Sequence, residues 1–256
     1  MIRASVVAMA LLLASTLAGE DPLEETSEQT LPLAADGTFA IQSIDGAVRI
    51  YGTSGAAVKI VTIRRAFSPA RLNALQMHVN AKPDAIALTT SSAPRSRWGW
   101  SDRSGTIDYI IDLPQRAKIT RADMATGELI IDGMRGGAIN AHLASGRLVT
   151  HNCFADQTLR LGEGVLEISC AWTEPKGLRI DASVESGNAQ VRVPADTSFQ
   201  LDARADSGNV SSDFSSPEKR RRGGIREIKE SFGENPATKL RLRVGSGNIR
   251  VESFNY

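Results

Sequence analysis

Six segments repeat one pattern, a glycine followed by alternating apolar residues: GELIIDG (127–133), GRLVTHN (146–152), GVLEISC (164–170), GNAQVRV (187–193), GNVSSDF (208–214) and GNIRVES (247–253). An earlier segment, GAVRIYG (46–52), has the same form. The second residue after each glycine is apolar and the fourth often is too, which is the two-residue period of a β-strand. Each predicted strand is therefore entered through a residue that tolerates positive φ.

The repeat has a period near 20 residues, because the glycines from Gly127 to Gly208 lie 19, 18, 23 and 21 residues apart. Each period also holds a second alternating segment, such as Ile139-Ala141-Leu143. This arrangement is typical of a solenoid, in which each coil buries its apolar face against neighbouring coils. The sequence predicts an all-β protein in which residues 115–256 form a parallel β-helix, or solenoid, with coils of about 20 residues.

An N-terminal β region is expected over residues 36–114, where alternating apolar segments are separated by turn signals. It carries one short helix, SPARLNALQ (68–76), in which Ser68 can cap and Pro69 takes the first helical position. Residues 215–237 interrupt the repeats and are interpreted as a loop insertion. After it, Leu240-Leu242-Val244 is expected to pair with Ile249-Val251 and to finish the stack.

The first 18 residues are typical of a secretory signal peptide, with Arg3, an apolar stretch over 6–13 and a small-residue cleavage site before Gly19. The alternative is a membrane anchor, but the apolar run is shorter than the roughly 18 residues that a span needs. We expect cleavage, an exported protein in the periplasm or at the cell surface, and no integral membrane segment afterwards. Residues 19–35 are acidic and lack periodicity, which predicts a flexible leader.

The charge balance argues against a nucleic-acid partner. The chain has 30 Lys and Arg against 29 Asp and Glu, and removal of residues 1–18 deletes Arg3 and no acid, which leaves 29 of each. A nucleic-acid-binding protein is expected to carry a strong basic excess.

No catalytic motif, metal-binding motif or cofactor motif is found, so no catalytic residue, metal or cofactor is expected. One arrangement leaves an enzyme possible: Asp181 and Asp202 occupy equivalent positions of successive coils, with Arg160 and Arg179 close by. Such a group could act on an acidic polysaccharide. The alternative is that these charges keep the outer sheet soluble and unassociated.

Two cysteines are candidates for a disulfide in an exported chain. Cys153 lies seven residues after Gly146, and Cys170 lies six after Gly164. Coils stacked in register lie about 4.8 Å apart, which is compatible with a bridge. The alternative is a pair of buried free thiols.

Three groups of residues are candidate contacts for a partner. The stretch 94–105 holds Trp98 and Trp100 beside Arg95 and Arg97, which could grip a sugar ring or an anionic polymer, or else the indoles could cover the sheet edge. The basic run Lys219, Arg220, Arg221 and Arg222 is either a solvated loop or a site for anionic polymers or proteolysis. The outward strand residues are Arg147, Gln190, Arg192 and Arg250.

The chain resembles a family of bacterial putative adhesins built from β-strand repeats, whose domain has no known function. The resemblance rests on SIDGAVRIYG (43–52), VKIVTIRRA (58–66), IDYIIDLP (107–114) and the ladder of glycine-led repeats. It implies a secreted or envelope-attached β-helix without catalytic residues.

These observations favour an exported, non-enzymatic binding or structural protein that contacts a surface polysaccharide or another envelope protein. The alternative is a periplasmic component of an envelope-stress or assembly system. A polysaccharide-active β-helix enzyme is the third hypothesis.

Overall fold

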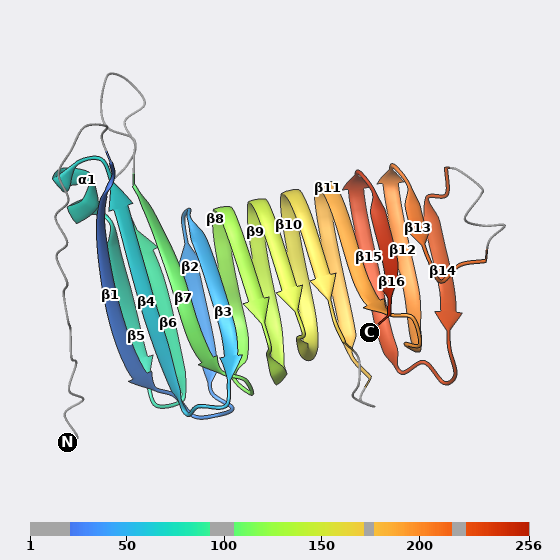
Figure 1. Ribbon diagram of the computed structural model, residues 1–256, viewed down its shortest axis with the longest axis horizontal. Helices are drawn as coiled ribbons and strands as arrows, with labels where there is room; N and C mark the ends of the chain where they lie inside the picture. The colour runs from blue at the N-terminus through green and yellow to red at the C-terminus, as the bar shows by residue number, and fades with distance from the viewer. Residues whose placement is uncertain (1–20, 93–104, 172–176, 217–223, 256) are drawn as a thin grey trace.

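The computed structural model describes residues 21–92, 105–171, 177–216 and 224–255, which form an all-β, open, solenoid-like structure (Figure 1). Within these residues the strands make one 16-stranded sheet, accompanied by a single short helix. The strands are β1 Leu23–Pro32, β2 Thr38–Ser43, β3 Ala47–Thr53, β4 Ala57–Ala66, β5 Gln76–Lys82, β6 Ala85–Ser91, β7 Thr106–Pro114, β8 Lys118–Asp132, β9 Arg135–His151, β10 Phe154–Ser169, β11 Arg179–Pro194, β12 Phe199–Ser207, β13 Val210–Ser212, β14 Glu227–Phe232, β15 Thr238–Ser246 and β16 Ile249–Phe254.

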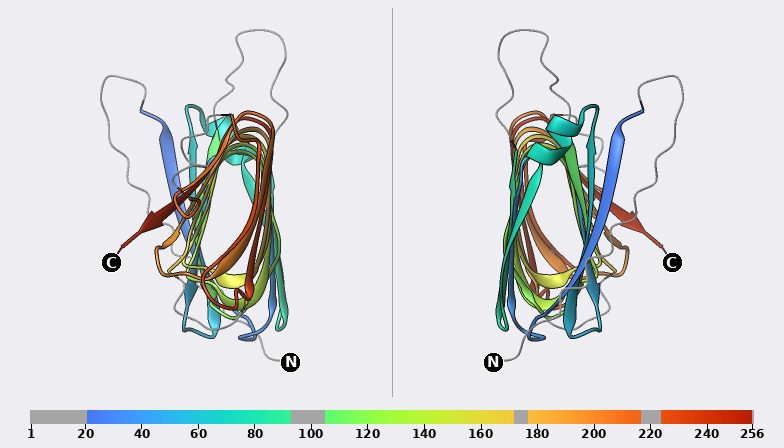
Figure 2. Two further views of the ribbon diagram at one scale, coloured as in Figure 1. Left: turned by 90° about the vertical axis from the view of Figure 1, so that its right-hand side faces the viewer. Right: turned by 90° about the vertical axis from the view of Figure 1, so that its left-hand side faces the viewer.

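The sheet folds over on itself into two walls, which are seen end-on in Figure 2. Each of β8 to β11 is one long strand that runs along one wall, bends at its glycine and returns along the other. The front wall, which faces the viewer in Figure 1, has the order β1, β4, β7, β3, the second halves of β8 to β11, β16 and β13. The back wall has the order β5, β6, β2, the first halves of β8 to β11, β15, β12 and β14.

The repeat glycines form a column along the fold line. Gly127, Gly146, Gly164 and Gly187 pair directly with one another on parallel strands. Their φ angles lie between +126° and +138°, a region that L side chains rarely adopt. A Cβ on Gly164 would lie 1.9 Å from the carbonyl oxygen of Gly146, so both the backbone conformation and the close approach of neighbouring coils require glycine.

The core lies between the walls and consists of the inward residues of each strand. It is continuous from Leu33 to Val251, and therefore crosses the expected boundary near residue 114 without a break. At the C-terminal end the core is closed by three aromatic rings, with Phe199 at the centre. Its ring lies 5.0 Å from that of Phe214 and 5.1 Å from that of Phe232.

The sequence predicted that the C-terminal strands pair with each other and finish the stack, and this prediction is wrong. β15 pairs in parallel with both β11 and β12, and β16 pairs with both β11 and β13, so the last two strands lie inside the sheet. They form the two halves of one coil and do not pair with each other. Asn side chains support this order: the backbone N–H of Asn248 donates to Asn188 Oδ1, and that of Asn209 donates to Asn248 Oδ1, both at 3.1 Å.

The expectation of a flexible leader over residues 19–35 is wrong for the described part, because this stretch contains β1. β1 pairs antiparallel with β4 along its whole length. The acidic residues are explained by ion pairs across the strands: Glu25 lies 2.6 Å from Arg64, and Glu28 lies 3.1 Å from Lys59. Acidity here reflects a basic neighbouring strand and not disorder.

The stretch predicted as a loop, 215–237, also contains a strand. β14 pairs antiparallel with β12 at the edge of the back wall, and its Ile228 is buried. The predicted helix is confirmed as α1, Pro69–Ala74, where the Ser68 hydroxyl accepts from the Arg71 N–H. No helix among the described residues is long and apolar enough to cross a membrane.

Candidate binding face

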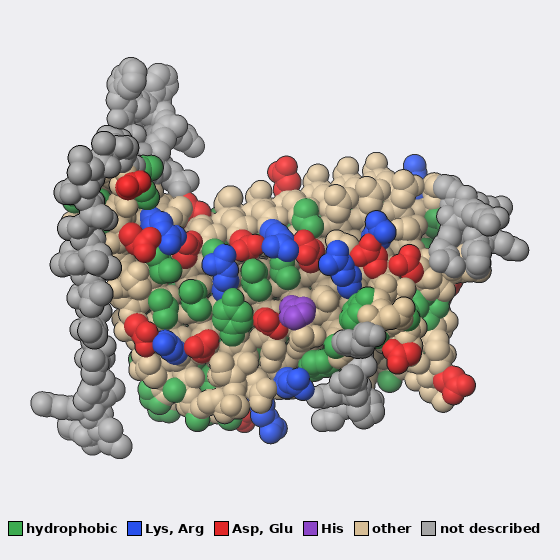
Figure 3. Space-filling view, viewed as in Figure 1, with side chains coloured by type: hydrophobic (Ala, Val, Ile, Leu, Met, Phe, Trp, Pro, Cys, Tyr) green, Lys and Arg blue, Asp and Glu red, His purple; other side chains and the backbone are tan. Residues whose placement is uncertain are grey.

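The outer surface of the front wall is a flat sheet face whose outward side chains form rows across the strands. The register is even, so each outward residue lies beside the corresponding one of the next strand. The central row, as we call it, consists of Val61, Ile110, Arg49, Ile130, Val149, Glu167, Gln190 and Arg250. Its four aliphatic members are half-buried although they point outward. Figure 3 shows hydrophobic side chains gathered in the middle of this face, between rows of charged ones.

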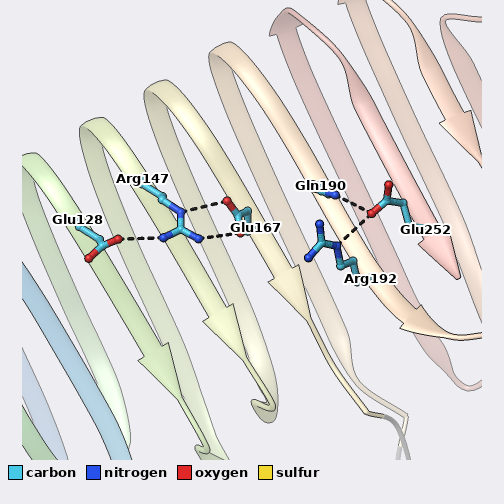
Figure 4. Close-up of polar contacts among 6 residues, drawn as sticks. All are labelled: Glu128, Arg147, Glu167, Gln190, Arg192 and Glu252. Atoms are coloured by element: carbon cyan, nitrogen blue, oxygen red, sulfur yellow. Dashed lines mark hydrogen bonds and ion pairs between the residues drawn. The ribbon is translucent and has the colours of Figure 1, made fainter. Parts of the chain in front are cut away.

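Charged side chains on one side of the central row are joined into a ladder of ion pairs. Arg147 stands between two carboxylates of neighbouring strands (Figure 4). Its Nη1 lies 2.9 Å from Glu128, and its Nε and Nη2 each lie 3.0 Å from the two oxygens of Glu167. Arg49 extends the ladder through a 3.0 Å contact with Glu128. These hydrogen bonds raise the pKa of the Arg147 guanidinium and lower that of the Glu167 carboxyl.

A second charged group gathers on Glu252 of β16. Gln190 Nε2 donates to its carboxylate at 2.6 Å, and Arg192 Nε does so at 3.0 Å. Arg250 lies 2.7 Å from the other carboxylate oxygen. The hydrogen bond from Gln190, followed by the two arginines, holds the pKa of Glu252 below its usual range.

Between these two groups the face is hollowed. A cavity of about 250 Å³ opens between β9, β10 and β11. Val149 gives it an apolar part, and polar groups come from His151, Glu167, Ser169, Gln190 and Arg192. His151 is held by a 3.1 Å contact between its Nδ1 and Asp132. An apolar patch with convergent polar groups is the usual composition of a binding site.

The structure brings together one set of the predicted contact residues. Arg147, Gln190, Arg192 and Arg250 all lie on this face, and each contacts an acidic neighbour. Trp98, Trp100, Arg95 and Arg97, and the basic run Lys219, Arg220, Arg221 and Arg222, lie outside the described residues.

Sequence reasoning missed the aliphatic part of the central row. The signal was present in consecutive apolar residues, such as Ile60-Val61, Ile110-Ile111 and Leu129-Ile130-Ile131. Strict alternation predicts one polar face, whereas an unbroken apolar run indicates a strand with apolar side chains on both faces. Such runs on β4 and β7, and again on β8 and β9, predict apolar side chains on the outer wall on both sides of Arg49 of β3.

The residues of the enzyme hypothesis are arranged differently from the expectation. Asp181 and Asp202 do not lie on successive coils, because Arg241 of the inserted β15 stands between them in register. Arg160 lies one strand further away, opposite Ser183 and not Asp181. Among the described residues, no three His, Cys, Asp or Glu side chains are placed to hold a metal ion.

Residues 34–252 match the family model described as Toastrack DUF4097. The chain belongs to this Toastrack family. No curated protein matches the sequence. The fold is similar to that of a crystal structure described as a putative cell adhesion protein from Clostridium sporogenes, at 15% identity and a TM-score of 0.50, over 91% of this chain and 100% of that one. This similarity concerns the fold alone.

Two further crystal structures align over most of the chain with lower scores. Both are described as putative adhesins. The one from Bacteroides fragilis has 14% identity and a TM-score of 0.28, over 89% of this chain and 97% of that one. The one from Parabacteroides merdae has 8% identity and a TM-score of 0.24, over 89% and 96%.

The predicted disulfide is absent from this Toastrack sheet. Cys153 and Cys170 are both free and buried. The reason lies in the register: Gly146 pairs with Gly164, and His151 with Ser169, so the position opposite Cys170 is Asn152. The one-residue difference in spacing after the two glycines therefore offsets the two cysteines.

We expect both thiols to be unreactive in the folded protein. Burial is the main cause that raises the pKa of each to about 12, so little thiolate is present at mildly alkaline pH. Ellman's reagent should give no rapid reaction with the native protein and full reaction in denaturant without reductant. Denatured protein that reacts only after reduction would instead reveal a bridge.

The Toastrack face also predicts a local pH response. The folded-state pKa of Glu167 is depressed, chiefly by Arg147, so the stability gained from this pair is present above the usual Glu pKa of 4.5 and is lost as pH falls through the depressed value. Arg147→Met should raise the pKa of Glu167 in a carboxyl NMR titration. Because the pair is partly exposed, the free energy of unfolding at neutral pH should fall by no more than about 1 kcal/mol. Arg204→Met on the back wall is the control and should leave Glu167 unchanged.

Proposed function

We propose that this Toastrack protein is an exported, non-enzymatic binding or structural protein of the bacterial cell envelope, of the adhesin type. Its repeating unit is the parallel β-helical coil of about 20 residues, and its binding surface is the front wall. The partner is a surface polysaccharide or another envelope protein. The observation that carries the proposal is the aliphatic part of the central row, which is half-buried on the outer face: Val61 and Ile110 on one side of Arg49, and Ile130 and Val149 on the other.

The chemistry of this face supports binding more than catalysis. Contiguous apolar surface rimmed by polar groups is characteristic of interaction sites. The Arg147 and Glu252 groups beside it are already satisfied by their neighbours, so they can border a partner at little cost in desolvation of unpaired charge. The hollow next to Val149 adds a concave spot where a projecting group could lodge.

The test is a double substitution in the central row, Ile130→Gln with Val149→Gln. Both side chains point outward, so the variant should keep a cooperative thermal transition. Binding to purified envelope polysaccharide and to envelope protein fractions from the bacterium that encodes the chain is then measured. We expect affinity to fall at least about ten-fold, or about 1.4 kcal/mol.

The matched control is Ala138→Gln with Ala144→Gln, two exposed positions in the first half of β9 on the back wall. It adds the same side chains to the opposite surface and should bind as the unmodified protein does. Equal binding by all three proteins would refute the front wall as the contact surface.

A second experiment separates a surface role from the periplasmic alternative. Trypsin is added to intact cells and to cells with a permeabilised outer envelope. The run at 219–222 supplies four consecutive cleavage sites in the sequence. Cleavage on intact cells would support an adhesin at the surface, whereas protection until permeabilisation would favour a component of a periplasmic stress or assembly system.

A further inference from the structure

A second candidate site lies on the back wall, on the opposite side of the sheet from the central row. Outward side chains of β11, β15, β12 and β14 line a groove of about 420 Å³ near the C-terminal end of the stack. Two rows cross this groove. The first contains Asp181, Arg241, Asp202 and Lys229, and the second contains Arg179, Lys239, Gln200 and Ser231.

The first row alternates in sign, and each of its two carboxylates is paired with an arginine. Arg241 lies 3.7 Å from Asp181. Asp202 is engaged by Arg243 at 2.9 Å, and this hydrogen bond keeps its pKa below the usual range. This row therefore offers carboxylate oxygens as hydrogen-bond acceptors and little net charge.

The second row contains two like charges side by side, which lowers the stability of the fold. Arg179 and Lys239 lie directly opposite each other on adjacent parallel strands. Like charges in that position are destabilising. Neither has an ion-pair partner among the residues that the structure describes, whereas Arg147, Arg192 and Arg250 on the front wall each have an acidic partner. Both side chains lie in a groove, and not on a convex surface. The carboxylate nearest to Arg179 in the sheet, that of Asp156, accepts a hydrogen bond from the Arg179 backbone N–H at 2.9 Å.

Uncharged polar groups continue the second row away from the two cations. Gln200 donates through Nε2 to the carbonyl oxygen of Pro236 at 3.2 Å, which fixes its amide and leaves Oε1 to accept. Ser231 is exposed and presents a hydroxyl next to it. A ligand in this groove would meet two cations at one end. At the other it would meet the neutral Gln200 and Ser231 beside Glu230, whose carboxylate accepts a hydrogen bond from the Ser215 hydroxyl.

We propose that this groove binds an anionic saccharide segment, with a carboxylate or sulfate group between Arg179 and Lys239 and its hydroxyl groups on Gln200, Ser231 and the carboxylates of Asp181 and Asp202. Carboxylate acceptors in the same groove favour a hydroxyl-rich ligand with sparse negative charge, and disfavour a dense polyanion. The inference does not depend on the central row, because the two sites lie on opposite walls.

The experiment measures calorimetric binding of four probes to the full chain: an oligogalacturonate, a sulfated glycosaminoglycan oligosaccharide, a neutral malto-oligosaccharide of equal length and inorganic sulfate. We expect one or both anionic oligosaccharides to bind and the neutral one not to bind. Which one binds distinguishes carboxylate from sulfate recognition. Arg179→Gln with Lys239→Gln should weaken that binding at least ten-fold.

The control is Arg160→Gln with Arg204→Gln, which removes the same charge from the same wall outside the groove. If both double variants lose the same affinity for the oligosaccharide, the loss is caused by net charge alone, and the proposed site is refuted. Absence of oligosaccharide binding, or sulfate binding as tightly as the oligosaccharides, would also overturn it. The central-row variant Ile130→Gln with Val149→Gln should bind the oligosaccharide normally, so failure of the front-wall proposal and failure of this one give different results.

Discussion

Replacing Gly164 with alanine is expected to lower the free energy of unfolding by about 2–6 kcal/mol. Gly164 has a φ of +130°, and an L side chain held in such a region costs about 1–3 kcal/mol. The new Cβ would also meet the carbonyl oxygen of Gly146 at 1.9 Å, and relief of such overpacking costs about 1–3 kcal/mol more. The clash is with backbone, so no side-chain rotation can remove it.

The matched control is Gly136→Ala. Gly136 also has a positive φ, +97°, but its added Cβ would have nothing within 4 Å. Its destabilisation should therefore be limited to the backbone cost. Chemical denaturation of both variants measures the difference. Similar unfolding free energies for the two would show that the coils can separate at the fold line without loss, which contradicts the close stacking of the glycine column.

Deletion of residues 238–256 is expected to abolish cooperative folding of the C-terminal half. The deletion removes five buried aliphatic residues, Leu240, Leu242, Val244, Ile249 and Val251. Each contributes roughly 1.5–3 kcal/mol by burial. Their sum is comparable with the about 5–15 kcal/mol of net stability typical of a whole domain.

The deletion leaves a gap between β11 and β12, where β15 pairs with both strands. Direct pairing of β12 with β11 would not close this gap easily. That pairing would preserve the glycine stacking but would place Asp202 directly beside Asp181, without Arg241 between them. Directly opposed like charges are destabilising. We therefore expect β11 to keep an open edge in the truncated chain.

Hydrogen exchange read by mass spectrometry tests this expectation. Amides of β11 and β12 should lose protection in the truncated protein, while those of β3, β7 and β8 keep it. Deletion of Asn255 and Tyr256 alone, beyond the end of β16, is the control and should leave exchange unchanged. An unchanged pattern in the longer deletion would mean that β15 and β16 are dispensable for the stack.

The parallel stacking of the glycine-bent strands was predictable because two independent signals agree in the sequence. Alternation after each glycine indicates the strands, and the near-constant spacing of Gly127, Gly146 and Gly164 indicates that they stack. The helix α1 was also predictable, since Ser68 and Pro69 are specific signals for a helix N-terminus. Both predictions rest on residues that are close together in the sequence.

The order of the last coils was not predictable from the same signals. Gly187, Gly208 and Gly247 are each followed by asparagine and then an apolar residue, so the three segments are equivalent as stacking partners. Their order is decided by side chains far apart in the chain, such as Arg241 between two aspartates. β1 was not predicted for a related reason, because its acidic residues pair with Arg64, Arg65 and Lys59 on β4, about 30 to 40 residues later in the sequence.

The candidate site was predictable in part. Outward arginines follow from alternation alone, and Arg147, Arg192 and Arg250 lie where alternation places them. Their ionic partners depend on register between coils, which alternation does not specify. The apolar patch was readable from unbroken apolar runs, but the groove on the back wall required the order of β11, β15 and β12.

The internal position of β15 and β16 makes strands on both sides of them depend on a segment that follows those strands in the sequence. The sheet neighbours of β11 on this side are β15 and β16, which follow β12 to β14 in the sequence. A prematurely terminated chain keeps the exposed strand edge of β11, and exposed edges promote association with other chains. Such fragments are also the species that cellular proteases and chaperones remove. Residues 238–254 thus cover the edge of β11 and keep it from associating with other chains.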